Sequence, residues 1–338
     1  MPGTDVVTTP PARDLAPAAA GPEAARLAAA AAAYADAQMA SSTRRAYESD
    51  WADFTAWCAK HPPAVPLPAP GPVVALYLAD RAQGGLAVST LSRRLAAIRT
   101  IHKSADHPPP AGSELLAVWA GIRRTHGRPP RQKRAIITED LRRIVARLPT
   151  TPSGVRDKAL ILVSYAAALR RSESAVLELD DGKSLRRGIR LEWVARGFRI
   201  VIDASKADQE GEGAVIAVPY GKTKLCAGVA LNAWLELARI SSGPVFRPVD
   251  RHGNIAPRAM SEKAVNDTIK RAAARAKIDP ALIGGHSLRS GMVTQAIMNE
   301  VAVPLIMKQT RHVKVDTLNR YVRMAGDMDR SAGGKLGL

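Results

Sequence analysis

Five short segments in the second half of the 338-residue chain carry basic side chains, histidines and a tyrosine. The segments are ALRRSE at 168–173, SKADQEGEG at 205–213, HSLR at 286–289, RH at 311–312 and RYV at 320–322. Their candidate catalytic side chains are Arg170, Lys206, His286, Arg289, His312 and Tyr321. His286 and Arg289 are three residues apart at the start of an expected helix, so they share one helix face.

This set of side chains fits chemistry at a phosphodiester. Each of the two arginines can offer a planar pair of donors to the nonbridging oxygens, where charge grows in the transition state. The Tyr321 hydroxyl can attack phosphorus and hold the phosphate covalently, while His286 accepts or relays its proton near neutral pH. Lys206 can protonate the leaving oxygen, and His312 can donate a hydrogen bond to the phosphate. We expect no metal ion and no cofactor, because arginine and lysine supply the positive charge.

Each residue taken singly also has an ordinary structural explanation. An arginine that follows a helix often pairs with the helix C-terminus, and a lone histidine is more often structural than catalytic. Lys206 could be a plain turn residue, with Lys222 or Lys224 in its role, and Tyr321 could serve packing alone. The complete set in this order favours function.

The order Arg, Lys, His-x-x-Arg, His, Tyr resembles the tyrosine recombinases, also called the phage integrase family. ALRRSE, GHSLRSGMVTQAI and TRHVKVDTLNRYVR resemble three boxes of that family, and the resemblance spans about residues 41–325. WADFTAWCAKH and GGLAVSTLSRRLAAIRTIH are similar to the core-binding domain of Cre-like members. The resemblance favours Arg170 over Arg171, because Arg170 directly follows Leu169 and precedes Glu173 by three. Glu173 is expected to orient a basic partner.

The resemblance implies a site-specific recombinase with a mainly α fold and a small antiparallel β-sheet. A helical core-binding domain and an α+β catalytic domain would clamp duplex DNA that carries an inverted-repeat recognition site. Tyr321 would form a 3′-phosphotyrosine and free a 5′ hydroxyl, without ATP, and strand exchange would use a ring of four protomers. Two alternatives stay open: a type IB-like topoisomerase that acts as a monomer, and a DNA-binding regulator without catalysis.

The charge of the chain supports a nucleic-acid partner. Lys and Arg total 49 against 31 Asp and Glu, a formal net charge of +18. Residues 1–40 carry a net charge of −2 and residues 41–338 one of +20, so the charge lies in the expected folded body. The two cysteines, Cys58 and Cys226, exclude a disulfide scaffold, and the absence of a long apolar run excludes a membrane span. We expect a cytoplasmic, DNA-associated protein.

The sequence predicts four successive regions. Residues 1–40 form a flexible Ala/Pro-rich tail with a helical turn or two near Glu23–Gln38, and residues 41–126 form the helical domain. Residues 127–135 form a basic linker, and residues 136–338 form the catalytic domain, with short β-strands at 191–194, 198–202 and 214–219.

Candidate DNA contacts come from one helix and from the linker. They are Arg93, Arg94, Arg99, Arg128, Arg131 and Lys133. The alternative for the helix and for the linker is an ordinary solvated basic surface.

Overall fold

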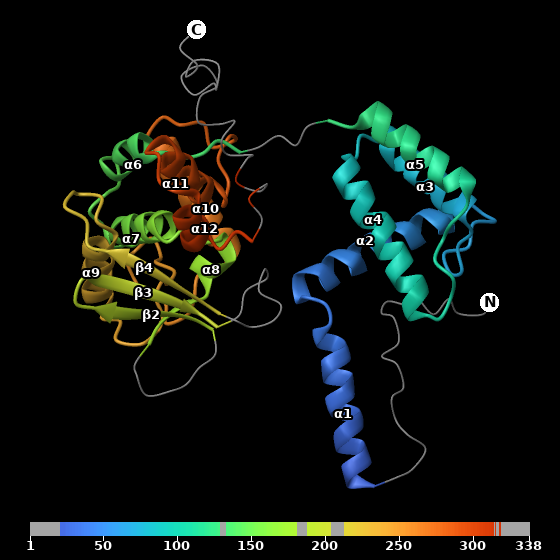
Figure 1. The fold of residues 1–338 in the computed structure, drawn as a ribbon, viewed down its shortest axis with the longest axis horizontal. Helices are drawn as coiled ribbons and strands as arrows, with labels where there is room; N and C mark the ends of the chain where they lie inside the picture. Colours follow the sequence, from blue (N-terminus) through green and yellow to red (C-terminus); the bar gives the residue numbers. More distant parts are fainter. Residues whose placement is uncertain are drawn as a thin grey trace. The chain divides into compact units, whose positions relative to one another are not determined.

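The computed structural model describes residues 21–128, 133–180, 188–203, 213–313, 315 and 318. The chain divides into two compact units, Met1–Pro130 and Arg131–Leu338 (Figure 1). Within the described ranges, no helix is long and apolar enough to cross a membrane.

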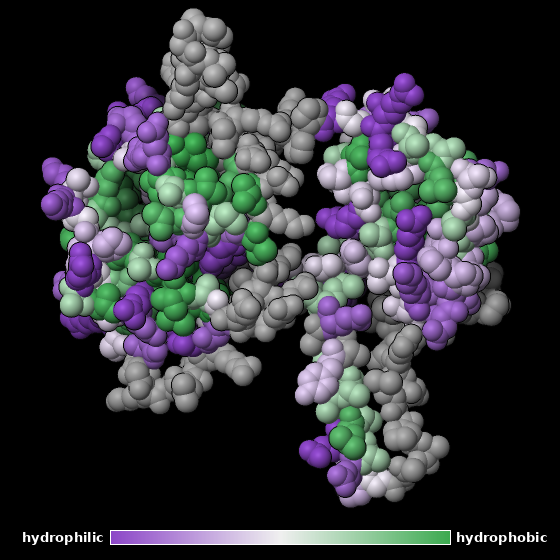
Figure 2. Space-filling model, viewed as in Figure 1, coloured by the Kyte–Doolittle hydropathy of each residue, from purple (hydrophilic) through white to green (hydrophobic). Residues whose placement is uncertain are grey.

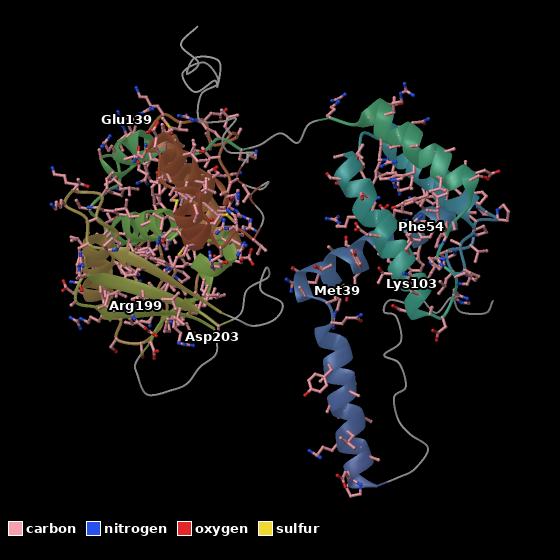
Figure 3. The ribbon with its side chains drawn as sticks, in the orientation of Figure 1. Met39, Phe54, Lys103, Glu139, Arg199 and Asp203 are labelled. Atoms are coloured by element: carbon pink, nitrogen blue, oxygen red, sulfur yellow. The ribbon has the colours of Figure 1, made fainter. Side chains whose placement is uncertain are left out.

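The first unit is helical, and its described residues contain no strand. Its helices are α1 (Pro22–Ala37), α2 (Ser41–Lys60), α3 (Gly71–Gln83), α4 (Val88–Ser104) and α5 (Ser113–His126). Helix α2 packs on α4, and α3 packs on α4 and α5. Phe54 of α2, labelled in Figure 3, is fully buried with its ring 4.9 Å from that of Tyr77.

Helix α1 differs from the expectation of a flexible tail. Where we expected a turn or two, the chain forms 16 helical residues. Alanine has the strongest helix propensity of all residues, and this segment is mostly alanine.

The second unit combines seven helices and a five-stranded sheet among its described residues. The helices are α6 (Thr138–Val145), α7 (Pro152–Ala166), α8 (Arg171–Ala175), α9 (Ala227–Ala238), α10 (Glu262–Arg275), α11 (Ser287–Met298) and α12 (Val303–Thr310). The strands are β1 (Leu177–Leu179), β2 (Ile189–Val194), β3 (Gly197–Ile202), β4 (Ala214–Pro219) and β5 (Gly243–Pro244). The strand order is β4-β3-β2-β1-β5.

The sheet is mixed, which corrects the expectation of an antiparallel one. Strand β3 pairs antiparallel with both β2 and β4, and β5 pairs antiparallel with β1. Strand β1 runs parallel to β2, with Leu177 opposite Ile189. Asp203, labelled in Figure 3, follows β3 and accepts a hydrogen bond from the Gly188 backbone N–H at 2.9 Å. This bond ties the end of β3 to the start of β2, next to the segment that contains Lys206.

Helix α7 lies at the centre of the second unit and contacts α8, α9, α10 and α11 (Figure 1). Its apolar run from Ala159 to Val163 is buried. Figure 2 shows apolar patches on the surface of this unit. The exposed apolar side chains of the unit include Val301, just before α12, and Val303 and Leu305 on α12.

Candidate active site

Arg289 is a buried guanidinium that two helix ends hold in place. It lies on α11, its Nη1 donates to the Ala168 carbonyl at 2.6 Å, and its Nη2 donates to the Thr310 carbonyl. Ala168 follows α7 and Thr310 ends α12, so both acceptors are carbonyls at helix C-termini, where the helix carries partial negative charge. These bonds orient the guanidinium with neutral groups and preserve its positive charge.

Close packing of α11 sets the position of Arg289. The Ile136 N–H donates to the Ser287 carbonyl at 3.0 Å. A Cβ added at Gly291 would lie 1.8 Å from the Ile136 carbonyl oxygen, so only glycine allows this approach.

Arg170 reaches the site because of the way α7 ends. Ala168 takes a left-handed conformation (φ 49°), and the Leu169 N–H donates to the Ser164 carbonyl at 2.9 Å. This pattern is a Schellman motif with alanine in the usual glycine position. It turns the chain so that Arg170 forms the N-cap of α8.

Glu173 fixes the Arg170 side chain. Its carboxylate accepts the Arg170 backbone N–H and Nη1, each at 2.7 Å. Burial alone would raise the pKa of Glu173, but the neighbouring Arg311 and Arg170 lower it, so the carboxylate is ionised. Arg171 points elsewhere and pairs with exposed Glu262 at 2.9 Å.

His312 forms a hydrogen-bonded chain that defines its tautomer. Its Nδ1 lies 2.8 Å from the Thr310 hydroxyl, which itself donates to the Ile306 carbonyl at 2.7 Å. Nδ1 therefore carries the proton, and Nε2 accepts from Arg289 Nη2 at 3.3 Å. Burial and then the charges of Arg289 and Arg170 lower the pKa of His312 to about 4, so the ring is neutral at neutral pH.

His286 forms the N-cap of α11 and keeps part of its surface exposed. Partial burial and then the charges of Arg289 and Arg170 lower its pKa. A neutral imidazole at this place can accept a proton.

The structure therefore brings five of the sequence-predicted residues together. They are Arg170, Glu173, His286, Arg289 and His312. Lys206 and Tyr321 lie outside the described residues. Lys222 and Lys224, the alternatives to Lys206, are exposed. They follow the C-terminal end of β4, whereas Lys206 precedes this strand in the sequence.

The predicted DNA contacts of α4 divide into two kinds. Arg93 keeps a half-exposed side chain while it bonds to Asp50 at 2.7 Å, and Arg99 is partly exposed. Arg94 does not fit a DNA-binding face. Its side chain is 14% exposed and donates to Asp53 and to the Tyr77 hydroxyl. Arg93 and Arg94 differ in this way because adjacent positions on a helix face different directions.

The predicted linker contacts fall at the edges of the described ranges. Arg128 is exposed, Arg131 lies outside the described residues, and Lys133 donates from Nζ to the Ala281 carbonyl at 2.7 Å. Lys133 thus contacts the loop that leads to His286.

One residue of the site was not predicted. Arg311 directly follows α12 and donates from Nη2 to Glu173 at 2.8 Å, so it shares that carboxylate with Arg170. An arginine at a helix end, where glycine or asparagine is usual, is the signal in the sequence that could have indicated it.

Two family models match this chain. Residues 134–327 match the model described as phage integrase family, and residues 34–107 match the phage integrase N-terminal SAM-like domain. An integrase/recombinase xerD homolog of Selenomonas ruminantium is 36% identical over 289 residues, which cover 84% of this chain and 82% of the relative. Tyrosine recombinase XerC of Mycobacterium sp. (strain KMS) is 25% identical over 297 residues, with coverage of 83% and 88%.

Solved structures share the fold. A XerH recombinase bound to a palindromic difH substrate, in a post-cleavage complex, aligns with a TM-score of 0.62 at 13% identity, covering 93% of this chain and 84% of that one. A lambda integrase tetramer bound to a Holliday junction aligns with a TM-score of 0.54 at 14% identity, with coverage of 84% and 72%. The resemblance seen in the sequence boxes is thereby confirmed. The chain belongs to the phage integrase family, the tyrosine recombinases, whose members cleave and rejoin DNA and need neither metal nor ATP.

Proposed function

We propose that the protein is a site-specific recombinase that cleaves and rejoins duplex DNA through a 3′-phosphotyrosine on Tyr321. The observation that carries this proposal is the convergence of Arg170, His286, Arg289 and His312 from three separate parts of the chain. Two guanidiniums and two neutral imidazoles in one place form a site for an anion that undergoes proton-coupled substitution.

In the proposed cleavage step, the Tyr321 oxygen attacks the scissile phosphorus and the bond to the 5′ oxygen breaks. His286 accepts the tyrosine proton, directly or through a relay, and Lys206 protonates the leaving 5′ oxygen. Arg170 and Arg289 stabilise the charge on the nonbridging oxygens. The 5′ hydroxyl of a partner strand reverses the step, so the number of phosphodiester bonds is conserved and no energy source is required.

The proposed role of His312 requires a change at Nε2. In the structure this atom accepts a hydrogen bond from Arg289, so it cannot also donate one. A bound phosphate would accept the Arg289 N–H and would add negative charge near the ring, which favours the protonated imidazole. His312 could then donate from Nε2 to the phosphate.

The segment that contains Lys206 joins two neighbouring antiparallel strands, since β3 ends at Ile202 and β4 begins at Ala214. A lysine in such a connection suits a general acid that enters the site when DNA is bound.

We further propose a DNA-associated homotetramer in the cytoplasm, assembled on an inverted-repeat site. The basic charge of the chain supports DNA binding. The exposed apolar side chains near α12 support self-association.

Trapping of a covalent adduct tests the proposed function and identifies the target sequence in the same experiment. The full chain is incubated with fragmented DNA of its source replicon, stopped with SDS, and the protein-linked DNA is precipitated and sequenced. The expected result is a defined site linked by its 3′ end, with no adduct from Tyr321→Phe. An adduct that persists in Tyr321→Phe contradicts the assignment of the nucleophile, and adducts without a common sequence favour the topoisomerase alternative.

A further inference from the structure

Arg311 occupies a backbone conformation that arginine rarely adopts. It follows α12 with φ 58°, in the left-handed region that glycine tolerates best. Arg239 follows α9 in nearly the same conformation, with φ 51°, but its side chain is exposed. The Arg311 side chain is only 9% exposed. The two residues share a backbone conformation, so what distinguishes Arg311 is where its side chain lies.

The buried side chain of Arg311 runs to the carboxylate that holds Arg170. Glu173 Oε2 accepts both Arg311 Nη2 at 2.8 Å and the Arg170 backbone N–H at 2.7 Å, while Oε1 accepts Arg170 Nη1 at 2.7 Å. One buried carboxylate thus faces two guanidiniums. Because His312 is the next residue after Arg311, this carboxylate also links the two segments that carry Arg170 and His312.

Arg311 has more hydrogen-bonding capacity than it uses. Its Nε and Nη1 are buried and have no acceptor among the described residues. A buried donor without an acceptor is costly, and few occur in folded proteins. Arg170, in contrast, is 28% exposed and uses its Nη1 on Glu173. Its guanidinium can leave Glu173 for a phosphate only if another cation balances that carboxylate.

We propose that Arg311 is a positioning residue that keeps Glu173 neutralised when Arg170 turns to the DNA phosphate, a role that rests on the proposed function. Glu173 Oε1, once released by Arg170, gains a donor from the unused N–H groups of Arg311. After this exchange of partners, Glu173 is still paired with a guanidinium, that of Arg311, and the Arg170 charge is available to the phosphate. Arg311 acts through Glu173 and does not contact the DNA.

The test compares Arg311→Gly with Arg239→Gly in the full chain, on a nicked duplex made from the site that adduct sequencing identifies. Glycine removes the left-handed strain at both positions, so any shared effect on the backbone appears in both variants. We expect adduct formation to fall about 100-fold in Arg311→Gly and to stay near the wild-type rate in Arg239→Gly. DNA affinity should be nearly unchanged in both, and Arg311→Lys should recover part of the lost rate.

A double-mutant cycle with Glu173→Gln separates this role from a merely structural one. If Arg311 serves to balance the Glu173 charge, removing that charge makes Arg311 less necessary. The loss caused by Arg311→Gly should therefore shrink to a few-fold in the Glu173→Gln background. Wild-type adduct rates in Arg311→Gly, or an equal loss in both backgrounds, would overturn the inference alone. Absence of adducts from the wild-type protein would overturn the proposed function and this inference with it.

Discussion

Two clusters of arginines, one in each unit, show that the same residue type can serve different purposes. In the first unit, Asp53 accepts from Arg81 at 3.0 Å, from Arg94 and from the Tyr77 hydroxyl at 2.8 Å. Burial alone would raise the pKa of Asp53, but the Tyr77 hydrogen bond and the two arginines lower it. The guanidiniums of this cluster bond to anions, which makes the cluster part of the scaffold that joins α2, α3 and α4.

In the second unit, Arg289 bonds instead to two helix-end carbonyls and a neutral imidazole, and Arg170 shares Glu173 with Arg311. These contacts fix direction while they leave positive charge in the site. Carbonyls and a neutral imidazole leave the charge of Arg289 uncompensated for a bound anion, whereas the carboxylate of Asp53 neutralises charge in the first cluster.

The largest expected effect comes from Arg170→Ala. Loss of this guanidinium removes a donor to the phosphate in the transition state, so the rate of adduct formation should fall about 10²- to 10³-fold. Glu173 keeps its bond to Arg311, so the fold should persist. Single-turnover trapping measures the rate, and Arg171→Ala is the matched control because Arg171 pairs with Glu262 on the surface. A comparable loss in Arg171→Ala would contradict the assignment.

Arg94→Ala should act on stability and not on chemistry. The substitution removes the hydrogen bonds that Arg94 donates to Asp53 and to the Tyr77 hydroxyl. This loss should lower the free energy of unfolding of the first unit by about 1–3 kcal/mol. Hydrogen exchange followed by mass spectrometry measures the two units separately. Unchanged protection in α3 and α4 would show that Arg94 is not a scaffold residue.

Arg99→Ala should give a smaller effect, on DNA binding alone. If Arg99 contacts a phosphate, the slope of log affinity against log salt should decrease by about one. Titrations of a random-sequence duplex measure this slope, and Arg94→Ala, below its unfolding temperature, should leave it unchanged. The reverse outcome, in which Arg94 and not Arg99 alters the slope, would place the DNA contacts on the other side of α4.

Much of the fold could be predicted from the sequence because its signals are local. The strand Ala214–Pro219 has the predicted bounds, since its three β-branched residues lie between a polar, glycine-containing segment and a proline. Strands β1 and β5 were missed because three and two residues are too short for a period to show. The parallel pairing of β1 with β2 was missed with them, because it depends on a partner that the sequence does not reveal.

The same limit applies to the site. Arg170, His286, Arg289 and His312 lie in recognisable boxes, and the structure brings them together. Arg311 lies in one of those boxes as well, but its contact is with Glu173, 138 residues away in the chain. Arg94 was predicted as a DNA contact together with Arg93 and Arg99 of the same helix, whereas its partners Asp53 and Tyr77 come from other helices.

The smallest expected effect concerns His102, a structural histidine of the first unit that contrasts with the histidines of the candidate active site. His102 is fully buried in the first unit, where Nδ1 donates to the Ile98 carbonyl at 2.8 Å and Nε2 accepts the Ala69 N–H at 2.8 Å. Protonation would set two N–H groups against each other at Nε2, and burial lowers the pKa below the ordinary value of 6.5. The unfolded chain therefore binds the proton more readily, so the stability that neutral His102 provides is complete above about pH 6.5 and is lost as the pH falls toward the folded-state pKa. Hydrogen-exchange protection of α4, corrected for intrinsic exchange rates, should decrease from pH 7.5 to pH 5.5 in the wild type. The decrease should be much smaller in His102→Gln. An equal decrease in both proteins would assign the acid sensitivity of the first unit to other groups.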